Sequence, residues 1–306
     1  MTLALIVVGW ASMRAQNTER SSTTARKQLI AHRGASAYAP EHTPASYRLA
    51  LEQKADFVEP DLAVTKDNVL ICLHDDTLER TTNIGEVFPD RPSTRNVPAK
   101  PEGKHWLAND FTIDEIRRLD AGRWFKPEFA GQRVPTFQEM IDLVRGKAGI
   151  YPELKSPELY RARHVDQVKL FVDVIKKNGL DTADSLRTTP VIIQSFDEEA
   201  IRRVATELPT VPRVFLTEKD EDVSSARLRE LATFATGIAP EKVVIARHPE
   251  MVQQAHDLKL TVTSWTFRSD DPKSGYASVA DEMSHFLYDL GIDALFTNNP
   301  DKFPRR

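Results

Sequence analysis

Short apolar runs alternate with longer stretches of helical hydrophobic spacing from residue 28 to the end of the chain. Repeated alternation of strand and helix predicts a parallel sheet, and at 306 residues a (β/α)8 TIM barrel fits this pattern best. The strand-like runs are 28–32, 57–61, 69–73, 149–154, 191–195, 213–216, 243–245, 260–265 and 294–297. Helices are expected between them, including 44–54 and a long helix over 159–177 that Gly179 would end.

Nine strand candidates exceed the eight positions of a barrel. The turn-forming triplet Lys66-Asp67-Asn68 predicts that 57–65 and 69–74 form a β-hairpin arm. Folding the chain about the midpoint of Lys66 and Asp67 places residue 59 opposite residue 74. This register would bring Glu59 next to His74.

Residues 76–135 interrupt the alternation. The stretch is rich in proline, and its one clear helix is a short segment at 112–120 that begins with a Thr112/Glu115 capping-box pair. A second pair of this kind, Thr136 and Glu139, follows directly. The region is therefore expected to be a small inserted cap subdomain over one face of the barrel.

The first residues predict export. Residues 1–13 carry no charge and are mostly apolar, but they are too few to span a bilayer, so they resemble the apolar part of a signal peptide. Residues 16–27 are polar and basic, like a tether. The expected organisation is a signal-peptide-like segment and tether at 1–27 and a barrel domain at 28–306. A periplasmic or secreted protein without stable membrane insertion of the mature chain is expected, or a cytoplasmic one if the segment is not a signal.

Composition excludes some classes of function. Lys and Arg number 41 against 45 Asp and Glu, so no basic excess exists to bind nucleic acid. A single cysteine, Cys72, excludes a disulfide framework and a thiolate metal cluster. The oligomeric state cannot be inferred from these features.

Four polar clusters follow predicted strands, at the end of a barrel where catalytic groups gather. Each cluster alone is also compatible with surface ion pairs, solvated acids or a structural histidine. Together they bring two imidazoles, three carboxylates and two cations to one end of the barrel. The clusters are His32-Arg33-Gly34, Glu59-Pro60-Asp61, His74-Asp75 and Glu153-Leu154-Lys155.

This combination indicates metal-assisted cleavage of a phosphodiester. Carboxylates without cysteine favour Ca²⁺ or Mg²⁺ over zinc. Arg33 and Lys155 suit an anionic phosphoryl group, because a guanidinium binds phosphate with two hydrogen bonds. His32 and His74 suit proton transfer to and from the reacting oxygens. The charged run 218–222 is expected to be a solvated loop.

The ordered motifs resemble the glycerophosphodiester phosphodiesterase family, in particular its bacterial periplasmic branch. The resemblance is carried by 31–36 (AHRGAS), 40–43 (PEHT), 59–61 (EPD), 65–67 (TKD), 73–75 (LHD), 152–155 (PELK), 194–196 (QSF), 265–266 (WT) and 297–301 (TNNPD). It implies a TIM barrel with a small insertion, and hydrolysis of small-molecule glycerophosphodiesters such as glycerophosphocholine to sn-glycerol 3-phosphate and an alcohol.

The resemblance also assigns roles. It implies His32 and His74 as the acid/base pair, and Glu59, Asp61 and Glu153 as ligands of a divalent cation, with Ca²⁺ preferred over Mg²⁺. Arg33 and Lys155 correspond to phosphate contacts, and Trp265 and Phe196 to sides of the glycerol or headgroup pocket, with core packing as the alternative for Phe196. Glu41 is expected beside the site, either as a further metal ligand or in support of the ligands, and His42 in a structural role. The pair Asn298-Asn299 departs from the family pattern.

Alternatives stay open at this point. The nucleophile is either water or a neighbouring glycerol hydroxyl, which would give a cyclic phosphate, and either histidine can begin as the base. The same barrel would also suit a lyase or a phospholipase-D-like enzyme acting on lysophospholipids. A non-catalytic headgroup-binding protein is the alternative from another class.

Overall fold

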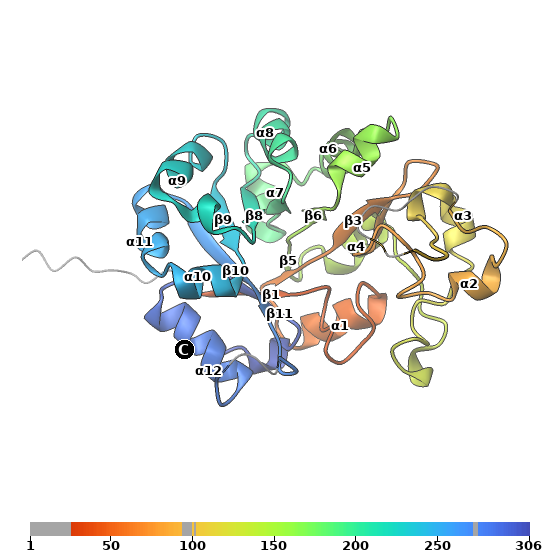
Figure 1. Cartoon of the computed structure of the whole chain (residues 1–306), viewed down its shortest axis with the longest axis horizontal. Coiled ribbons are helices and arrows are strands. Elements are labelled where there is room, and N and C mark those ends of the chain that lie inside the picture. Colours follow the sequence, from red (N-terminus) through yellow and green to blue (C-terminus); the bar gives the residue numbers. More distant parts are fainter. Residues whose placement is uncertain (1–25, 94–99, 101, 272–274) are drawn as a thin grey trace, which may run out of the picture.

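The computed structural model describes residues 26–93, 100, 102–271 and 275–306 (Figure 1). The signal-peptide-like run and nearly all of the tether lie outside these ranges, so export remains a prediction from sequence. Among the helices that the structure does describe, none has both the length and the apolar character needed to cross a membrane.

Eight parallel strand positions close into a barrel, which confirms the predicted fold class. Two positions are each made of two short strands separated by a dipeptide that contains a proline, Pro60 or Pro152. β1 pairs with both β2 and β11, and this double pairing closes the ring. In order, the positions are β1 (Gln28–Ala31), β2 (Phe57–Val58) with β3 (Asp61–Val64), β5 (Gly149–Ile150) with β6 (Glu153–Leu154), β7 (Ile193–Ser195), β8 (Arg213–Thr217), β9 (Gly237–Pro240), β10 (Thr261–Phe267) and β11 (Ala294–Thr297).

Helices surround these strands (Figure 1). Large apolar side chains such as Phe57, Tyr151 and Phe296 form a cluster of their own, separate from the main core cluster to which the helices contribute. The helices are α1 (Pro44–Glu52), α4 (Phe137–Val144), α5 (Pro157–Ala162), α6 (Gln167–Lys177), α7 (Ala183–Thr188), α8 (Glu198–Glu207), α9 (Ser225–Leu231), α10 (Lys242–Arg247), α11 (Glu250–Asp257) and α12 (Val279–Ser284).

The predicted long helix at 159–177 is wrong, because the chain breaks into α5 and α6. His164 has a left-handed backbone with φ of 61°, and the Asp166 side chain accepts a hydrogen bond from the Lys169 amide to begin α6. Gly179 follows the end of α6 with φ of 61°, as the sequence predicts.

The predicted hairpin is present, but its register differs by one residue. β4 (Leu70–Cys72) pairs antiparallel with β3, placing Leu62 opposite Cys72, and Leu73 donates a backbone hydrogen bond to Asp61. Asn68 adopts a left-handed conformation with φ of 61°, which extends the turn to three residues centred on Asp67. Glu59 therefore precedes the paired segment and does not lie opposite His74.

The predicted strand at 243–245 is also wrong, since these residues belong to α10. The β-branched run suggests a strand, but its burial follows a helix, with Val243 42% exposed and Val244 and Ile245 buried. The barrel position is filled instead by β9, which the sequence analysis missed. Glycine has a low strand propensity, so Gly237 made β9 hard to predict from sequence. The barrel nevertheless requires glycine here, because a Cβ would collide with Thr261 on the neighbouring strand.

The segment between β4 and α4 has its own apolar cluster. It contains α2 (Ile84–Val87) and α3 (Ile113–Ile116), so the expected helix at 112–120 is shorter than predicted. Leu78, Ile84, Trp106 and Phe111 join a cluster that also contains Ile71 of the hairpin. Both predicted capping boxes, at Thr112 and Thr136, are formed.

Gly237→Ala should destabilise the barrel. A Cβ at this position would lie 2.3 Å from Thr261 Oγ1 and 3.1 Å from a Val214 methyl, on the two neighbouring strands. We expect the free energy of unfolding, measured in urea, to fall by about 1–3 kcal/mol. Gly85→Ala in α2 is the matched control, because its nearest contact would be an ordinary 3.4 Å. Equal stability of the two variants would contradict this account of β9.

Candidate active site

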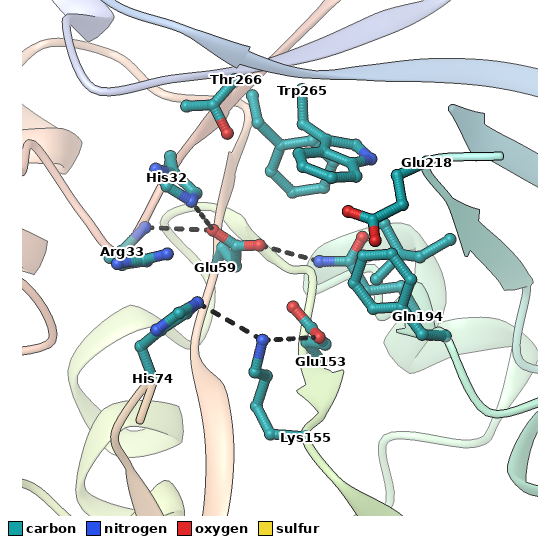
Figure 2. Close-up of a pocket in the computed structure, with 13 residues that line it drawn as sticks. His32, Arg33, Glu59, His74, Glu153, Lys155, Gln194, Glu218, Trp265 and Thr266 are labelled. Atoms are coloured by element: carbon teal, nitrogen blue, oxygen red, sulfur yellow. Dashed lines mark hydrogen bonds and ion pairs between the residues drawn. The ribbon is translucent and has the colours of Figure 1, made fainter. Parts of the chain in front are cut away.

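A cavity of about 280 Å³ opens at the carboxyl ends of the barrel strands (Figure 2). Of the nine residues predicted for the site, eight line this cavity, and the ninth, Asp61, is buried beside them. The lining residues are His32, Arg33, Glu59, His74, Glu153, Lys155, Gln194, Phe196, Leu216, Glu218, Trp265, Thr266 and Phe296.

Three buried carboxylates converge at this end of the barrel. Oxygen atoms of Glu59, Asp61 and Glu153 all lie within 4.8 Å of one another. Parallel pairing of β3 with β6 sets Asp61 directly beside Glu153, and Glu59 follows β2 in the same barrel position. The predicted convergence of acids that are distant in sequence is therefore present in the fold.

Burial makes this acidic triad electrostatically costly. Burial, together with the charges of Asp61 and Glu153, raises the pKa of Glu59 well above its usual range. Burial also raises the pKa of Glu153 to about 7, although Lys155 opposes the shift. Burial would raise the pKa of Asp61 too, but His42 and Arg33 outweigh it and hold that pKa well below its usual range. Three adjacent carboxylates cannot all ionise here without more positive charge.

The triad can hold a divalent cation. Asp61 Oδ1 is buried and, among the described residues, accepts no hydrogen bond. An unpartnered buried carboxylate oxygen fits a ligand of a hard, oxygen-preferring ion such as Ca²⁺ or Mg²⁺. The convergence of the three carboxylates and the unpartnered Asp61 oxygen are the structural basis for a metal site.

His42 supports the triad from behind, a contact that the sequence analysis did not identify. Its Nε2 donates to Asp61 Oδ2 at 2.9 Å, because a carboxylate can only accept. Its Nδ1 lies 2.9 Å from the hydroxyl of Tyr47, and both side chains are buried. Glu41 does not belong to the triad, because its carboxylate binds Arg33 and Arg80 instead.

His32 is oriented by the neighbouring strand. It follows β1, and its Nδ1 lies 2.6 Å from Asn298 Oδ1, just beyond β11. Nδ1 therefore carries the proton and donates to this amide oxygen. Nε2 is then unprotonated in the neutral ring, and it lies 3.7 Å from Glu59 Oε2. Burial and, secondarily, the charge of Arg33 lower the pKa of His32 to about 3. Asn298 is thus a positioning residue that sequence reasoning treated only as a departure from a pattern.

His74 lies on the opposite side of Glu59 from His32 (Figure 2). Its Nδ1 is 2.8 Å from Asp75 Oδ1, and its Nε2 is 3.4 Å from Lys155 Nζ. Burial lowers the pKa of His74, while the Asp75 hydrogen bond opposes the shift. The two imidazoles therefore have unlike partners, an amide for His32 and a carboxylate for His74.

Arg80 connects the two sides of this arrangement from the segment after β4. Its guanidinium donates to both oxygens of Asp75, at 3.1 and 3.0 Å, and to both oxygens of Glu41, at 3.0 and 2.6 Å. Glu41 in turn accepts from Arg33 at 3.2 Å. Arg80 thereby restrains Asp75, which contacts His74, and Glu41, which contacts Arg33.

Arg33 and Lys155 place two cations at the triad. Arg33 Nε is 3.4 Å from Asp61 Oδ2, and Lys155 Nζ is 3.1 Å from Glu153 Oε1. The turn that carries Arg33 depends on Gly34, which has φ of 85° and where a Cβ would lie 2.4 Å from Ser46 Oγ. Burial would lower the pKa of Lys155, but Glu153 and Asp61 outweigh it and raise that pKa. Lys155 is therefore positively charged.

Aromatic residues form another side of the cavity. Phe196 and Trp265 contact each other edge to face with ring centroids 5.7 Å apart. Glu218 is exposed, as expected for this charged run, and it also lines the cavity beyond β8. Gln194 donates to Glu59 Oε1 at 2.8 Å. Glu218 and Asn298 both directly follow a barrel strand. The four predicted clusters were chosen because they follow strands, so the same criterion could have identified these two residues.

Comparisons with known proteins agree with this geometry. Residues 32–302 match the model of the glycerophosphoryl diester phosphodiesterase family. The chain is similar to a glycerophosphodiester phosphodiesterase of Bacillus subtilis, with 34% identity over 90% of this chain and 84% of the relative. A Haemophilus influenzae enzyme of the same name is 27% identical, over 98% of this chain and 94% of the relative.

Solved structures show the same fold. An Oleispira antarctica phosphodiesterase, solved in complex with the product sn-glycerol-3-phosphate, superposes with a TM-score of 0.71 and 25% identity, over 90% of this chain and 95% of that one. A glycerophosphodiester phosphodiesterase from Agrobacterium tumefaciens gives a TM-score of 0.66 at 25% identity, over 90% of this chain and 98% of that one.

The family match spans nearly all of the described barrel and includes every residue of the cavity. The paired imidazoles, the acidic triad and the two cations at the strand ends are consistent with phosphodiester chemistry. The chain belongs to the glycerophosphoryl diester phosphodiesterase family, whose members are phosphoric diester hydrolases.

Proposed function

We propose that this protein hydrolyses small glycerophosphodiesters, such as glycerophosphocholine and glycerophosphoethanolamine, to sn-glycerol 3-phosphate and an alcohol. The observation that carries the proposal is the position of His32 and His74 above and below Glu59 of the buried triad (Figure 2), with Arg33 and Lys155 paired to Asp61 and Glu153. A phosphodiester carries one negative charge and needs a proton acceptor on one side and a donor on the other.

Charge at the reacting phosphoryl group is stabilised by Arg33 and Lys155. Arg33 is held by Glu41 and Asp61 on two of its nitrogens, which leaves its remaining N–H donors for phosphate oxygens. Lys155 lies between Glu153 and His74, so its ammonium is fixed at the centre of the site before substrate arrives. Such fixed donors stabilise developing charge without reorganisation.

The hydrogen-bond partners of the two imidazoles support different roles. The Asp75 carboxylate would offset the positive charge of a protonated imidazole at His74, as a carboxylate behind an imidazole does in other acid–base pairs. We therefore propose that His74 protonates the departing alcohol. Asn298 keeps the Nε2 lone pair of His32 free, so we propose that His32 accepts the proton of the nucleophile.

The proposed cofactor is a divalent cation held by Glu59, Asp61 and Glu153. When bound, it supplies a Lewis acid for phosphoryl and hydroxyl oxygens. We propose Ca²⁺ over Mg²⁺, because Ca²⁺ accepts irregular sets of carboxylates, whereas Mg²⁺ demands near-octahedral geometry and retains several waters.

His32→Ala and His74→Ala should each lower the release of glycerol 3-phosphate from glycerophosphocholine by roughly 10²–10⁴-fold. Each substitution removes one of the two proton transfers. We expect the fold to be retained, so the melting temperature should change little. His285→Ala is the control, since His285 bonds Asp289 away from the cavity. Near wild-type turnover in either of the first two variants would refute the acid/base assignment.

Chelation should abolish turnover, and added Ca²⁺ should restore it more fully than Mg²⁺. Calorimetric titration of the stripped protein should show one Ca²⁺ site, and Ca²⁺ should raise the melting temperature by mass action. Glu153→Gln should weaken Ca²⁺ binding by at least roughly tenfold. Glu52→Gln removes an equal charge from an exposed end of α1 and should change nothing. Unaltered Ca²⁺ affinity in Glu153→Gln would contradict the proposed ligand set.

A further inference from the structure

The cavity has two chemically different ends. The triad, both imidazoles and both cations gather at one end, where every polar group has charged neighbours. Apolar and aromatic side chains line the other end: Phe196, Leu216, Trp265 and Phe296. A diester has two arms on its phosphorus, so the two ends suit arms of different chemistry.

Glu218 stands at the aromatic end. It follows the last residue of β8, and Figure 2 shows its carboxylate beside Trp265 and directed into the cavity. The turn is fixed, because Thr217 Oγ1 accepts from the Lys219 amide at 3.0 Å and donates to Asp222 at 2.6 Å. Within the described part of the chain, Glu218 has neither a hydrogen-bond nor an ion-pair partner.

We propose that Glu218, Trp265 and Phe196 form a subsite for a cationic alcohol arm, such as a quaternary ammonium alcohol. This inference rests on the proposed function, because it names the class of alcohol that the same site prefers. A quaternary ammonium has apolar methyl groups and no hydrogen-bond donor. Aromatic faces and an unpaired carboxylate therefore stabilise it better than an array of hydrogen-bonding groups does.

The edge-to-face geometry of the two aromatic rings supports this assignment. With centroids 5.7 Å apart and planes at 87°, Phe196 and Trp265 form a corner rather than a stack. The Trp265 indole N–H donates to Ala239 at 2.8 Å, which fixes the orientation of this ring. Phe196 is 43% exposed and lines the cavity, so part of its ring is accessible to a ligand.

Neighbouring charges do not cancel this attraction. Lys155 is the closest cation to Phe196, with Nζ 6.0 Å from the ring, but it is paired with Glu153 at 3.1 Å. The glycerol arm has two free hydroxyls, which need polar partners. In the described cavity, most polar side chains lie around the triad. The aromatic end with Glu218 is thus left for the alcohol.

A pair of matched substrates tests the subsite. Glycerophosphocholine is compared with the glycerophosphodiester of 3,3-dimethylbutanol, which has the same shape and no charge. Glu218→Gln should lower kcat/KM for the choline ester by roughly threefold to tenfold and leave the neutral ester within about twofold. Glu221→Gln, an equal loss of charge three residues further on and outside the cavity, should alter neither. Phe196→Leu should likewise reduce the preference for choline.

A binding measurement separates failure of the subsite from failure of the proposed function. Tetramethylammonium chloride is titrated into the full protein and followed by tryptophan fluorescence against equal NaCl. Saturable quenching that weakens in Glu218→Gln but not in Glu221→Gln supports the subsite, even if neither ester is cleaved. An equal loss of kcat/KM for both esters in Glu218→Gln, or tetramethylammonium binding unchanged by this substitution, would overturn the inference.

Discussion

Mutual repulsion among three buried carboxylates is the constraint on which this active site depends. Oxygen atoms of Glu59, Asp61 and Glu153 lie within 4.8 Å of one another, and all three side chains are buried. Such an arrangement would be unstable in a core without compensation. The fold compensates with His42 and Arg33 at Asp61 and with Lys155 at Glu153, and a divalent cation would complete the balance. The positions of the charged groups around the cavity follow from this requirement.

Two other strand pairings of the same barrel orient the imidazoles. β1 lies beside β11, so His32 after one strand contacts Asn298 after the other. The β3–β4 hairpin returns the chain to the site, where His74 is held by Asp75. Arg80 extends this support into the segment after β4, because it binds Asp75 and Glu41 together. A segment outside the barrel alternation thus contributes to the rigidity of the reacting groups.

The barrel and the set of residues that gather at its site were predictable from sequence because both depend on short-range patterns. Strand ends gather at one face of a parallel barrel, so polar residues that follow apolar runs are expected together. Register was not predictable at this level, since one left-handed residue, Asn68, shifted the hairpin by one position. Strand β9 was missed because Gly237 and Pro240 have poor strand propensity, and the packing of Thr261 against Gly237 is a tertiary effect. The role of His42 depends on its distant partner Asp61, which no local pattern reveals, whereas Asn298 directly follows β11 and could have been identified from that position.

The acidic triad is proposed to bind one divalent cation between its three carboxylates. The most direct measurement is an anomalous difference map from a crystal of the protein soaked in Ca²⁺, recorded at long wavelength. We expect a single strong peak within about 2.3–2.6 Å of oxygens from Glu59, Asp61 and Glu153. Absence of a peak at full soaking, or a peak bound only by other residues, would contradict the proposed metal site.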